Sequence, residues 1–167
     1  GKHVNSIPIG IFSPDGKFLA TSDGIYNLET ETKMSSLVGQ AFSPDGKLLA
    51  STSGKVYNLE TGGTAHTFSN GNSVAFSPDG ETLAIGSSPE YYVNRANHKS
   101  SIYSLKTGEE ISDLSSDQTV KTVAFSPDGK YLAASWGAIN IYERSTGDVV
   151  RSYDKGDNVT FSPDGKY

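Results

Sequence analysis

The sequence predicts an all-β fold made of four-stranded antiparallel units, four of them complete and a fifth partial. Three observations predict it. The pentapeptide Phe-Ser-Pro-Asp-Gly occurs five times, a Tyr-containing strand pattern follows four of the copies, and no window of 11 or more residues shows a helical period. The copies begin at Phe12, Phe42, Phe76, Phe125 and Phe161, so they lie 30, 34, 49 and 36 residues apart.

Composition excludes several classes of protein. The chain has 167 residues, a net charge of −5 and no Cys, so it holds neither disulfides nor thiolate metal sites. Aromatic residues make up 10% and charged residues only 20%, which argues against disorder. The chain lacks a basic stripe and an apolar run of 18 residues, so we expect no nucleic-acid partner and no membrane insertion. No signal peptide is visible, which favours a cytoplasmic location.

Each unit begins with a strand, a turn and a second strand. Alternating apolar residues such as Val123 and Phe125 precede the turn, and a short run such as Leu132-Ala133 follows it. In Ser-Pro-Asp-Gly, Pro pre-sets φ, Asp suits the third position, and Gly takes the fourth, where a left-handed conformation is often needed. The predicted structural turn residues are Pro14, Asp15, Gly16, Pro44, Asp45, Gly46, Pro78, Asp79, Gly80, Pro127, Asp128, Gly129, Pro163, Asp164 and Gly165.

A third and a fourth strand follow in each complete unit. The third strands carry β-branched and aromatic residues, and three of them end in Thr-Gly; they cover residues 25–30, 56–61, 102–107 and 141–146. Weaker fourth strands are predicted at residues 34–37, 65–68, 110–114 and 149–153. The second-to-third connections of the first two units are short, which predicts tight hairpins there; the alternative is that loops are missing from the sequence.

Four short antiparallel strands that recur in this way describe the blade of a β-propeller. One blade cannot bury both of its faces, so neighbours must supply the core. We expect residues 1–167 to form one propeller domain or part of one, with repeats at about residues 7–37, 38–69, 70–115, 119–154 and 156–167. The last repeat stops as its second strand begins, so we expect a segment completed by further blades of the same chain or by a second copy.

The string apolar-x-Phe-Ser-Pro-Asp-Gly-Lys-x-Leu-Ala, followed by a strand and Leu-x-Thr-Gly, resembles the WD-repeat β-propeller family over residues 7–167. Tyr stands in place of the family's Trp-Asp signature, at Tyr26-Asn27, Tyr57-Asn58, Tyr103-Ser104 and Tyr142-Glu143. The Gly-His pair is also replaced, as at Gly39-Gln40. The resemblance therefore does not imply the family's buried His–Asp–Ser–Trp network. Tyr in this strand is also similar to the propellers of the bacterial Tol translocation system.

The acidic and His residues do not form a catalytic or metal-binding pattern. The five repeated Asp residues occupy equivalent turns on separate blades, so they form a ring and not a cluster. His3, His66 and His98 lie in different units without ligand spacing. No phosphate loop, dinucleotide fingerprint or nucleophile elbow is present. We therefore predict no catalytic residue, no metal and no cofactor.

The third unit has the only large insertion, residues 87–99, between its second and third strands. It contains residue types found at protein interfaces, and the predicted partner-binding residues are Tyr91, Tyr92, Arg95, His98, Lys99 and, in the equivalent connection of the fourth unit, Trp136. The resemblance places such connections on the face where partners commonly dock. The alternatives are a loop that tolerates insertion without a role, and a Trp that fills a gap between blades.

These observations predict a non-enzymatic protein-interaction scaffold that binds another protein or a peptide on one loop face. The first alternative is a propeller enzyme or small-ligand binder with a site in the central channel. The second is a purely structural role, as a spacer domain or a half-propeller that oligomerises. Fold analogy does not decide among them, because propellers host many functions.

Overall fold

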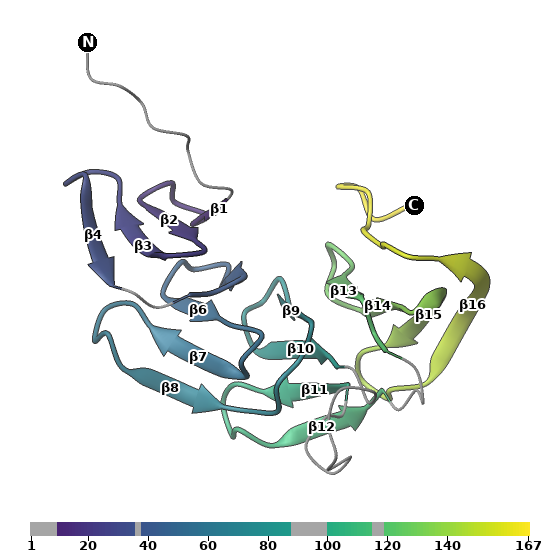
Figure 1. Cartoon of the computed structure of the whole chain (residues 1–167). Coiled ribbons are helices and arrows are strands. Elements are labelled where there is room, and N and C mark those ends of the chain that lie inside the picture. The colour runs from purple at the N-terminus through teal and green to yellow at the C-terminus, as the bar shows by residue number, and fades with distance from the viewer. Residues whose placement is uncertain (1–9, 36–37, 88–99, 115–118) are drawn as a thin grey trace.

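A computed structural model shows four antiparallel sheets arranged side by side in an open arc (Figure 1). It describes residues 10–35, 38–87, 100–114 and 119–167. This part of the chain contains strands and turns but no helix. The predicted all-β propeller of four complete blades and a partial fifth is confirmed.

Each blade has four strands that follow one another in chain order across the sheet. Blade 1 consists of β1 (Gly10–Phe12), β2 (Phe18–Thr21), β3 (Gly24–Asn27) and β4 (Thr32–Ser35). Blade 2 consists of β5 (Ala41–Phe42), β6 (Leu48–Ala50), β7 (Lys55–Asn58) and β8 (Thr64–Thr67). Blade 3 consists of β9 (Ser73–Phe76), β10 (Thr82–Gly86), β11 (Ser101–Ser104) and β12 (Glu110–Asp113). Blade 4 consists of β13 (Thr122–Phe125), β14 (Tyr131–Ser135), β15 (Gly137–Glu143) and β16 (Val149–Gly156).

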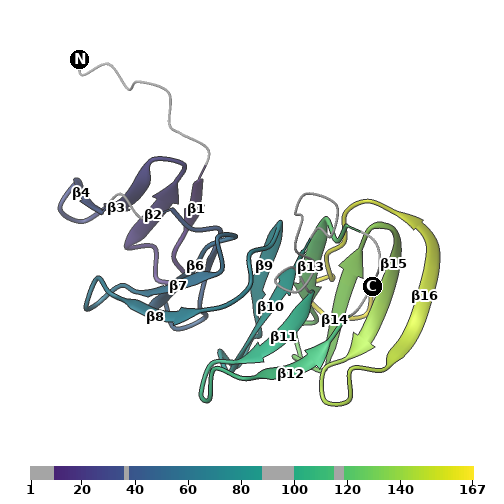
Figure 2. The same ribbon diagram turned by 60° about the horizontal axis from the view of Figure 1, so that its bottom comes forward.

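The first strand of each blade faces the inside of the arc. Strand β9 contacts both β5 and β13, so the first strands of neighbouring blades lie next to one another. The fourth strands lie on the outside, as β8, β12 and β16 do in Figure 1, and Figure 2 shows the same order from a second direction. The sheets therefore share a common centre, as in a propeller.

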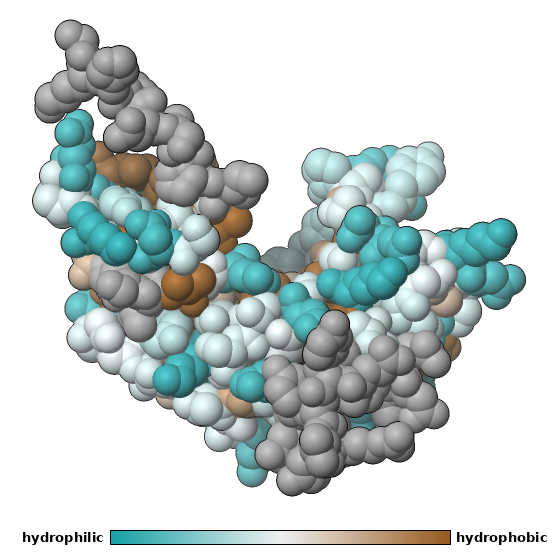
Figure 3. Space-filling view, in the orientation of Figure 1, coloured by the Kyte–Doolittle hydropathy of each residue, from teal (hydrophilic) through white to brown (hydrophobic). Residues whose placement is uncertain are grey.

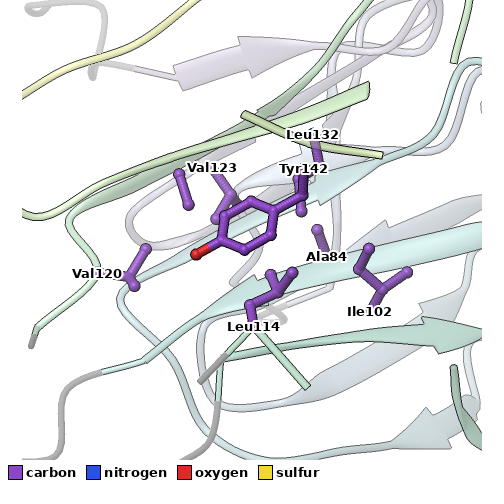
Figure 4. Close-up of a cluster of buried hydrophobic side chains, with 8 residues drawn as sticks. Ala84, Ile102, Leu114, Val120, Val123, Leu132 and Tyr142 are labelled. Atoms are coloured by element: carbon purple, nitrogen blue, oxygen red, sulfur yellow. The ribbon is translucent and has the colours of Figure 1, made fainter. Parts of the chain in front are cut away.

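The core lies between blades and follows one rule. Residues directly opposite on neighbouring strands share a face, so one face of each blade presents Ala and a β-branched residue and the other presents Leu and Tyr. Between blades 3 and 4, Ala84 and Ile102 meet Leu132 and Tyr142 (Figure 4). Between blades 2 and 3, Ala50 and Val56 meet Leu83 and Tyr103, and between blades 1 and 2, Ala20 and Ile25 meet Leu49.

The Ser-Pro-Asp-Gly turns repeat one hydrogen-bond pattern. In the first turn, Ser13 Oγ donates to Asp15 Oδ1 over 2.6 Å and accepts from the Phe18 N–H over 2.9 Å. The Lys17 N–H donates to the same Asp15 oxygen over 3.1 Å, and Gly16 has φ of 71°. The Ser13 hydroxyl, followed by the Lys17 N–H, holds the pKa of Asp15 below its usual value. These local bonds form the turn without help from other blades.

In blades 1, 2 and 4 the second-to-third connections are tight hairpins. Thr21 pairs with Gly24, so only Ser22 and Asp23 separate β2 from β3. This tight hairpin accounts for the short spacing between the second and third strands of blade 1. The residues present are enough to connect β2 to β3. The fourth strands differ from the predicted limits by a few residues, and β16 continues to Gly156.

The fifth unit differs from the prediction. Residues 158–161 were expected to form a strand, but they are not in a sheet. The turn that follows is formed as in the other units: Ser162 Oγ donates to Asp164 and accepts from the Tyr167 N–H over 2.9 Å. The hydrogen bonds of a turn form among its own residues, whereas the backbone N–H and C=O groups of a strand need a neighbouring strand as hydrogen-bond partner. In this unit no second strand is present to pair with residues 158–161.

Candidate functional site

The topology separates the connections into two ends. Because all strands are antiparallel, the Ser-Pro-Asp-Gly turns and the third-to-fourth turns lie at one end of the blades, the turn end. The second-to-third hairpins and the connections between blades lie at the other, the loop end. The insertion joins the loop-end limits of β10 and β11, and Trp136 lies in a loop-end hairpin.

Tyr91, Tyr92, Arg95, His98 and Lys99 lie outside the described residues. The structure does describe the two residues that flank this segment, Ser87 after β10 and Ser100 before β11. Both are buried, and the Ser87 N–H donates to Ser100 Oγ over 2.9 Å. The ends of the insertion are therefore joined to each other.

The same two serines are also held by the neighbouring connections. Ser87 Oγ donates to the Asn70 carbonyl over 3.2 Å, and the Val120 N–H donates to the Ser87 carbonyl over 2.9 Å. On the other side, the Leu114 N–H donates to the Ser100 carbonyl over 2.8 Å. The base of the insertion is thus bonded both to the connection before blade 3 and to the one after it. These roles cannot be predicted from the sequence, because Ser in a loop carries no distinctive signal.

Trp136 lies in the hairpin between β14 and β15. The backbone N–H of Trp136 donates to the Ala138 carbonyl over 2.9 Å. The side chain is partly buried and packs against the cluster that contains Leu114 and Val120, the residues bonded to the base of the insertion. Part of the Trp136 side chain is therefore packed between blades 3 and 4, and part remains exposed.

Two ion pairs lie at the loop end. Lys121 Nζ lies 2.6 Å from Asp157 Oδ1, next to the bond from Ser135 Oγ to the Asp157 carbonyl. In blade 1, Asp23 accepts from the hydroxyls of Thr21 and Tyr26, and these bonds, with Lys33, lower its pKa to about 2. The bond to Asp23 in turn raises the pKa of Tyr26. Such carboxylates stay ionised and suit a structural role better than proton transfer.

Within the described ranges, no group of three His, Cys, Asp or Glu side chains could hold a metal ion. In the same ranges, no helix is long and apolar enough to cross a membrane. The innermost strands β1, β5, β9 and β13 consist of Gly, Ala, Val, Ile, Phe, Ser and Thr, so they bring no acidic or imidazole group to the inside of the arc.

A groove lies between blade 4 and the fifth unit. Its volume is about 470 Å³, and Ile139, Ile141, Tyr153, Phe161 and Tyr167 are among the residues that line it. This groove is not among the features expected from the sequence. Its signal was present in the repeat, since Ile141 aligns with Ile25, Val56 and Ile102, which the next blade covers.

Comparisons with known proteins agree with the fold. The family pattern described as the anaphase-promoting complex subunit 4 WD40 domain matches residues 74–162, just over half of the chain. Among solved structures, a chain of Kuenenia stuttgartiensis hydrazine synthase superposes with a TM-score of 0.73 at 20% sequence identity. The match covers 99% of this chain but only 56% of that one, and at this identity it shows the fold alone. No curated protein matches the chain.

Proposed function

The chain belongs to the family of the anaphase-promoting complex subunit 4 WD40 domain, and we propose that it is a non-enzymatic scaffold that binds a protein or peptide at the loop end of blades 3 and 4. The expected resemblance to WD-repeat propellers is confirmed, and proteins of that family generally bind other proteins. The proposal adds the place of binding and the residues that carry it.

The observation that carries the proposal is the double anchoring of the insertion. Buried Ser87 and Ser100 are bonded to each other, to Asn70 and to Val120, which fixes both ends of the loop on two packed blades. Fixed ends lower the conformational entropy that a loop loses when it binds.

The residues of the loop suit a binding surface. Tyr91, Tyr92 and Arg95 are of the types that dominate binding energies at interfaces. Trp136 adds an aromatic ring that is only partly buried and packs against the same interblade cluster. In this proposal the two Tyr residues and Trp136 supply apolar contact, and Arg95, His98 and Lys99 supply hydrogen bonds to acidic or carbonyl groups of the partner.

Peptides selected from a display library on the immobilised wild-type chain provide the test. Replacing Tyr91 and Tyr92 by Ala should weaken their binding by roughly 30-fold, the effect of losing about 2 kcal/mol of contact energy. The melting temperature should stay unchanged. The matched control is Ile111→Ala on β12 of the same blade, which removes an exposed apolar side chain away from the loop end. Unchanged affinity in the double Tyr variant would contradict the proposal.

A further inference from the structure

The sequence has Asn followed by Gly at one place, Asn70-Gly71, in the connection between β8 and β9. This pair is chemically reactive, because the backbone nitrogen of the second residue can attack the side-chain amide carbon of the Asn. A side chain on the second residue hinders the attack, and Gly has none. Elsewhere in the described ranges Asn precedes Ser, Leu, Ile or Val, at Asn27, Asn58, Asn72, Asn140 and Asn158.

The fold requires Gly at position 71. A Cβ there would collide with Ile85 Cγ2 and with the Gly86 carbonyl oxygen, both at the end of the second strand of blade 3. Overpacking of this kind is destabilising, so a larger residue cannot be placed here to shield the Asn70 amide. The reactive pair is therefore a consequence of how blade 3 packs.

The side chain of Asn70 is accessible to water. The residue is exposed, and within the described ranges its side-chain amide makes no hydrogen bond. Asn58 differs, because its Oδ1 accepts from the N–H groups of Glu60 and Thr61, each over 2.9 Å. Figure 3 shows mainly hydrophilic residues and residues of intermediate hydropathy on the surface over blades 2 and 3. The Asn70 amide is thus free to react, and water can reach it.

The backbone on both sides of the pair restrains the reaction. The Gly71 N–H donates to the Thr52 carbonyl of blade 2 over 2.8 Å. The Asn70 carbonyl accepts from the buried Ser87 Oγ over 3.2 Å. The attack needs the Gly71 nitrogen, so the bond to Thr52 must open first. The rate of the reaction therefore depends on local opening of this connection.

We propose that Asn70 is a deamidation site controlled by this connection, and that its conversion releases the base of the insertion. When the connection opens, the Gly71 nitrogen forms a bond to Asn70 Cγ. The Cγ–Nδ2 bond breaks, and ammonia leaves with the proton of the Gly71 N–H. Water then opens the cyclic imide at either of its two carbonyl carbons, which gives aspartate or isoaspartate.

Isoaspartate changes the backbone group to which Ser87 is bonded. The main chain then runs through the side-chain carbon atoms of residue 70, which lengthens it by a methylene group, and the original carbonyl becomes a free carboxylate. The tight packing of Gly71 against Ile85 leaves no space for a longer chain, so the bonds to Thr52 and Ser87 are lost. One end of the insertion is then held less firmly. The site does not rest on the proposed function, because its conversion is measured without a partner.

Incubation of the intact chain in mildly alkaline buffer, followed by peptide mapping with mass spectrometry, tests the site. Conversion at Asn70 should be slower than in a free peptide of residues 66–75 by roughly tenfold or more, because only the opened connection reacts. Asn58 is the internal control and should not convert, since it precedes Leu59. Asn70→Gln should abolish the isoaspartate signal at this position.

Ser87→Ala tests the link between this site and the insertion. It frees the Asn70 carbonyl and should speed conversion by about threefold to tenfold, the effect of losing one hydrogen bond. Ser135→Ala is the matched control, because Ser135 is also buried and its Oγ donates to the Asp157 carbonyl of another connection. This control should leave conversion at Asn70 unchanged.

Amide exchange of the converted chain tests the consequence. Exchange should be faster than in the original chain at Ser87 and at Val120, whose N–H donates to the Ser87 carbonyl; unchanged exchange at both would overturn the proposal. So would the absence of conversion at Asn70 after the peptide has reacted fully, or conversion as fast as in the peptide while circular dichroism shows a folded chain. Equal conversion rates in the two Ser variants would also overturn it.

Discussion

Arg144 at the end of β15 reaches from blade 4 to Asp79 in the Ser-Pro-Asp-Gly turn of blade 3, with 2.6 Å between Nη1 and Oδ2. Burial raises the pKa of Asp79, but the Ser77 hydroxyl, the Glu81 N–H and Arg144 together bring it below its usual value. This ion pair joins two blades at the turn end, where the other bonds of each turn stay within one blade.

Removal of this ion pair should have a small effect on stability. Both side chains are partly exposed, so Arg144→Ala and Asp79→Asn should interact by about 0.2–1 kcal/mol in a double-mutant cycle. Urea unfolding in low salt measures this coupling, and 1 M NaCl should reduce it. A coupling above about 2 kcal/mol, or one insensitive to salt, would contradict a surface ion pair.

The chain should lose stability in acid. The pKa of the turn Asp residues Asp15, Asp45, Asp128 and Asp164 is lowered in the folded state, in each case mainly by the neighbouring Ser hydroxyl. A lowered folded-state pKa stabilises the fold above the unfolded value of about 3.9, and this stability disappears as the pH falls through the folded value. For Asp23 the window lies between about pH 4 and pH 2.

Urea midpoints measured from pH 6 to pH 2 check this prediction. The midpoint should be flat above pH 5 and fall below pH 4. Replacing Ser126 by Ala removes the hydroxyl that bonds Asp128 and should reduce the slope in acid. A midpoint that rises as the pH falls would show that the carboxylates destabilise the fold.

Glu31 should be a weak point of blade 1. Three third-to-fourth turns have Gly in the left-handed region, with φ of 70° at Gly62, 76° at Gly108 and 77° at Gly147, but blade 1 has Glu31 at 54°. Glu31→Gly should relieve this strain and raise the free energy of unfolding by about 0.5–1 kcal/mol, after the entropy cost of Gly. Thermal unfolding measures the gain. Gly62→Ala is the converse control and should lower the melting temperature; a gain there would refute the explanation.

Gly71 should be intolerant of any side chain. A Cβ at this position would lie 2.4 Å from Ile85 Cγ2 and 2.6 Å from the Gly86 carbonyl oxygen. Gly71→Ala should therefore cost about 1–3 kcal/mol by overpacking. Gly63→Ala is the matched control, because its nearest neighbour is a side-chain oxygen at 3.5 Å. Equal melting temperatures for the two variants would mean that blade 3 shifts to accept the methyl group.

Much of the fold could be predicted because the same turn and strand patterns recur in each unit of the sequence. Each turn is fixed by its own residues, as the bonds among Ser13, Asp15 and Phe18 show. Strand pairing in the fifth unit could not be predicted from its local pattern, since residues 158–161 alternate correctly but have no partner. The base of the insertion was missed for a similar reason. The roles of Ser87 and Ser100 depend on Asn70 and Val120, which only the packing of two blades brings close.

Hydrogen–deuterium exchange of the intact chain, with and without a peptide selected on it, measures whether binding takes place at the loop end of blades 3 and 4. We predict that the peptide slows amide exchange at residues 87–100 and in the hairpin around Trp136. We also predict unchanged exchange at the Ser-Pro-Asp-Gly turns. Protection confined to the turn end or to the innermost strands, with residues 87–100 unaffected, would contradict this prediction.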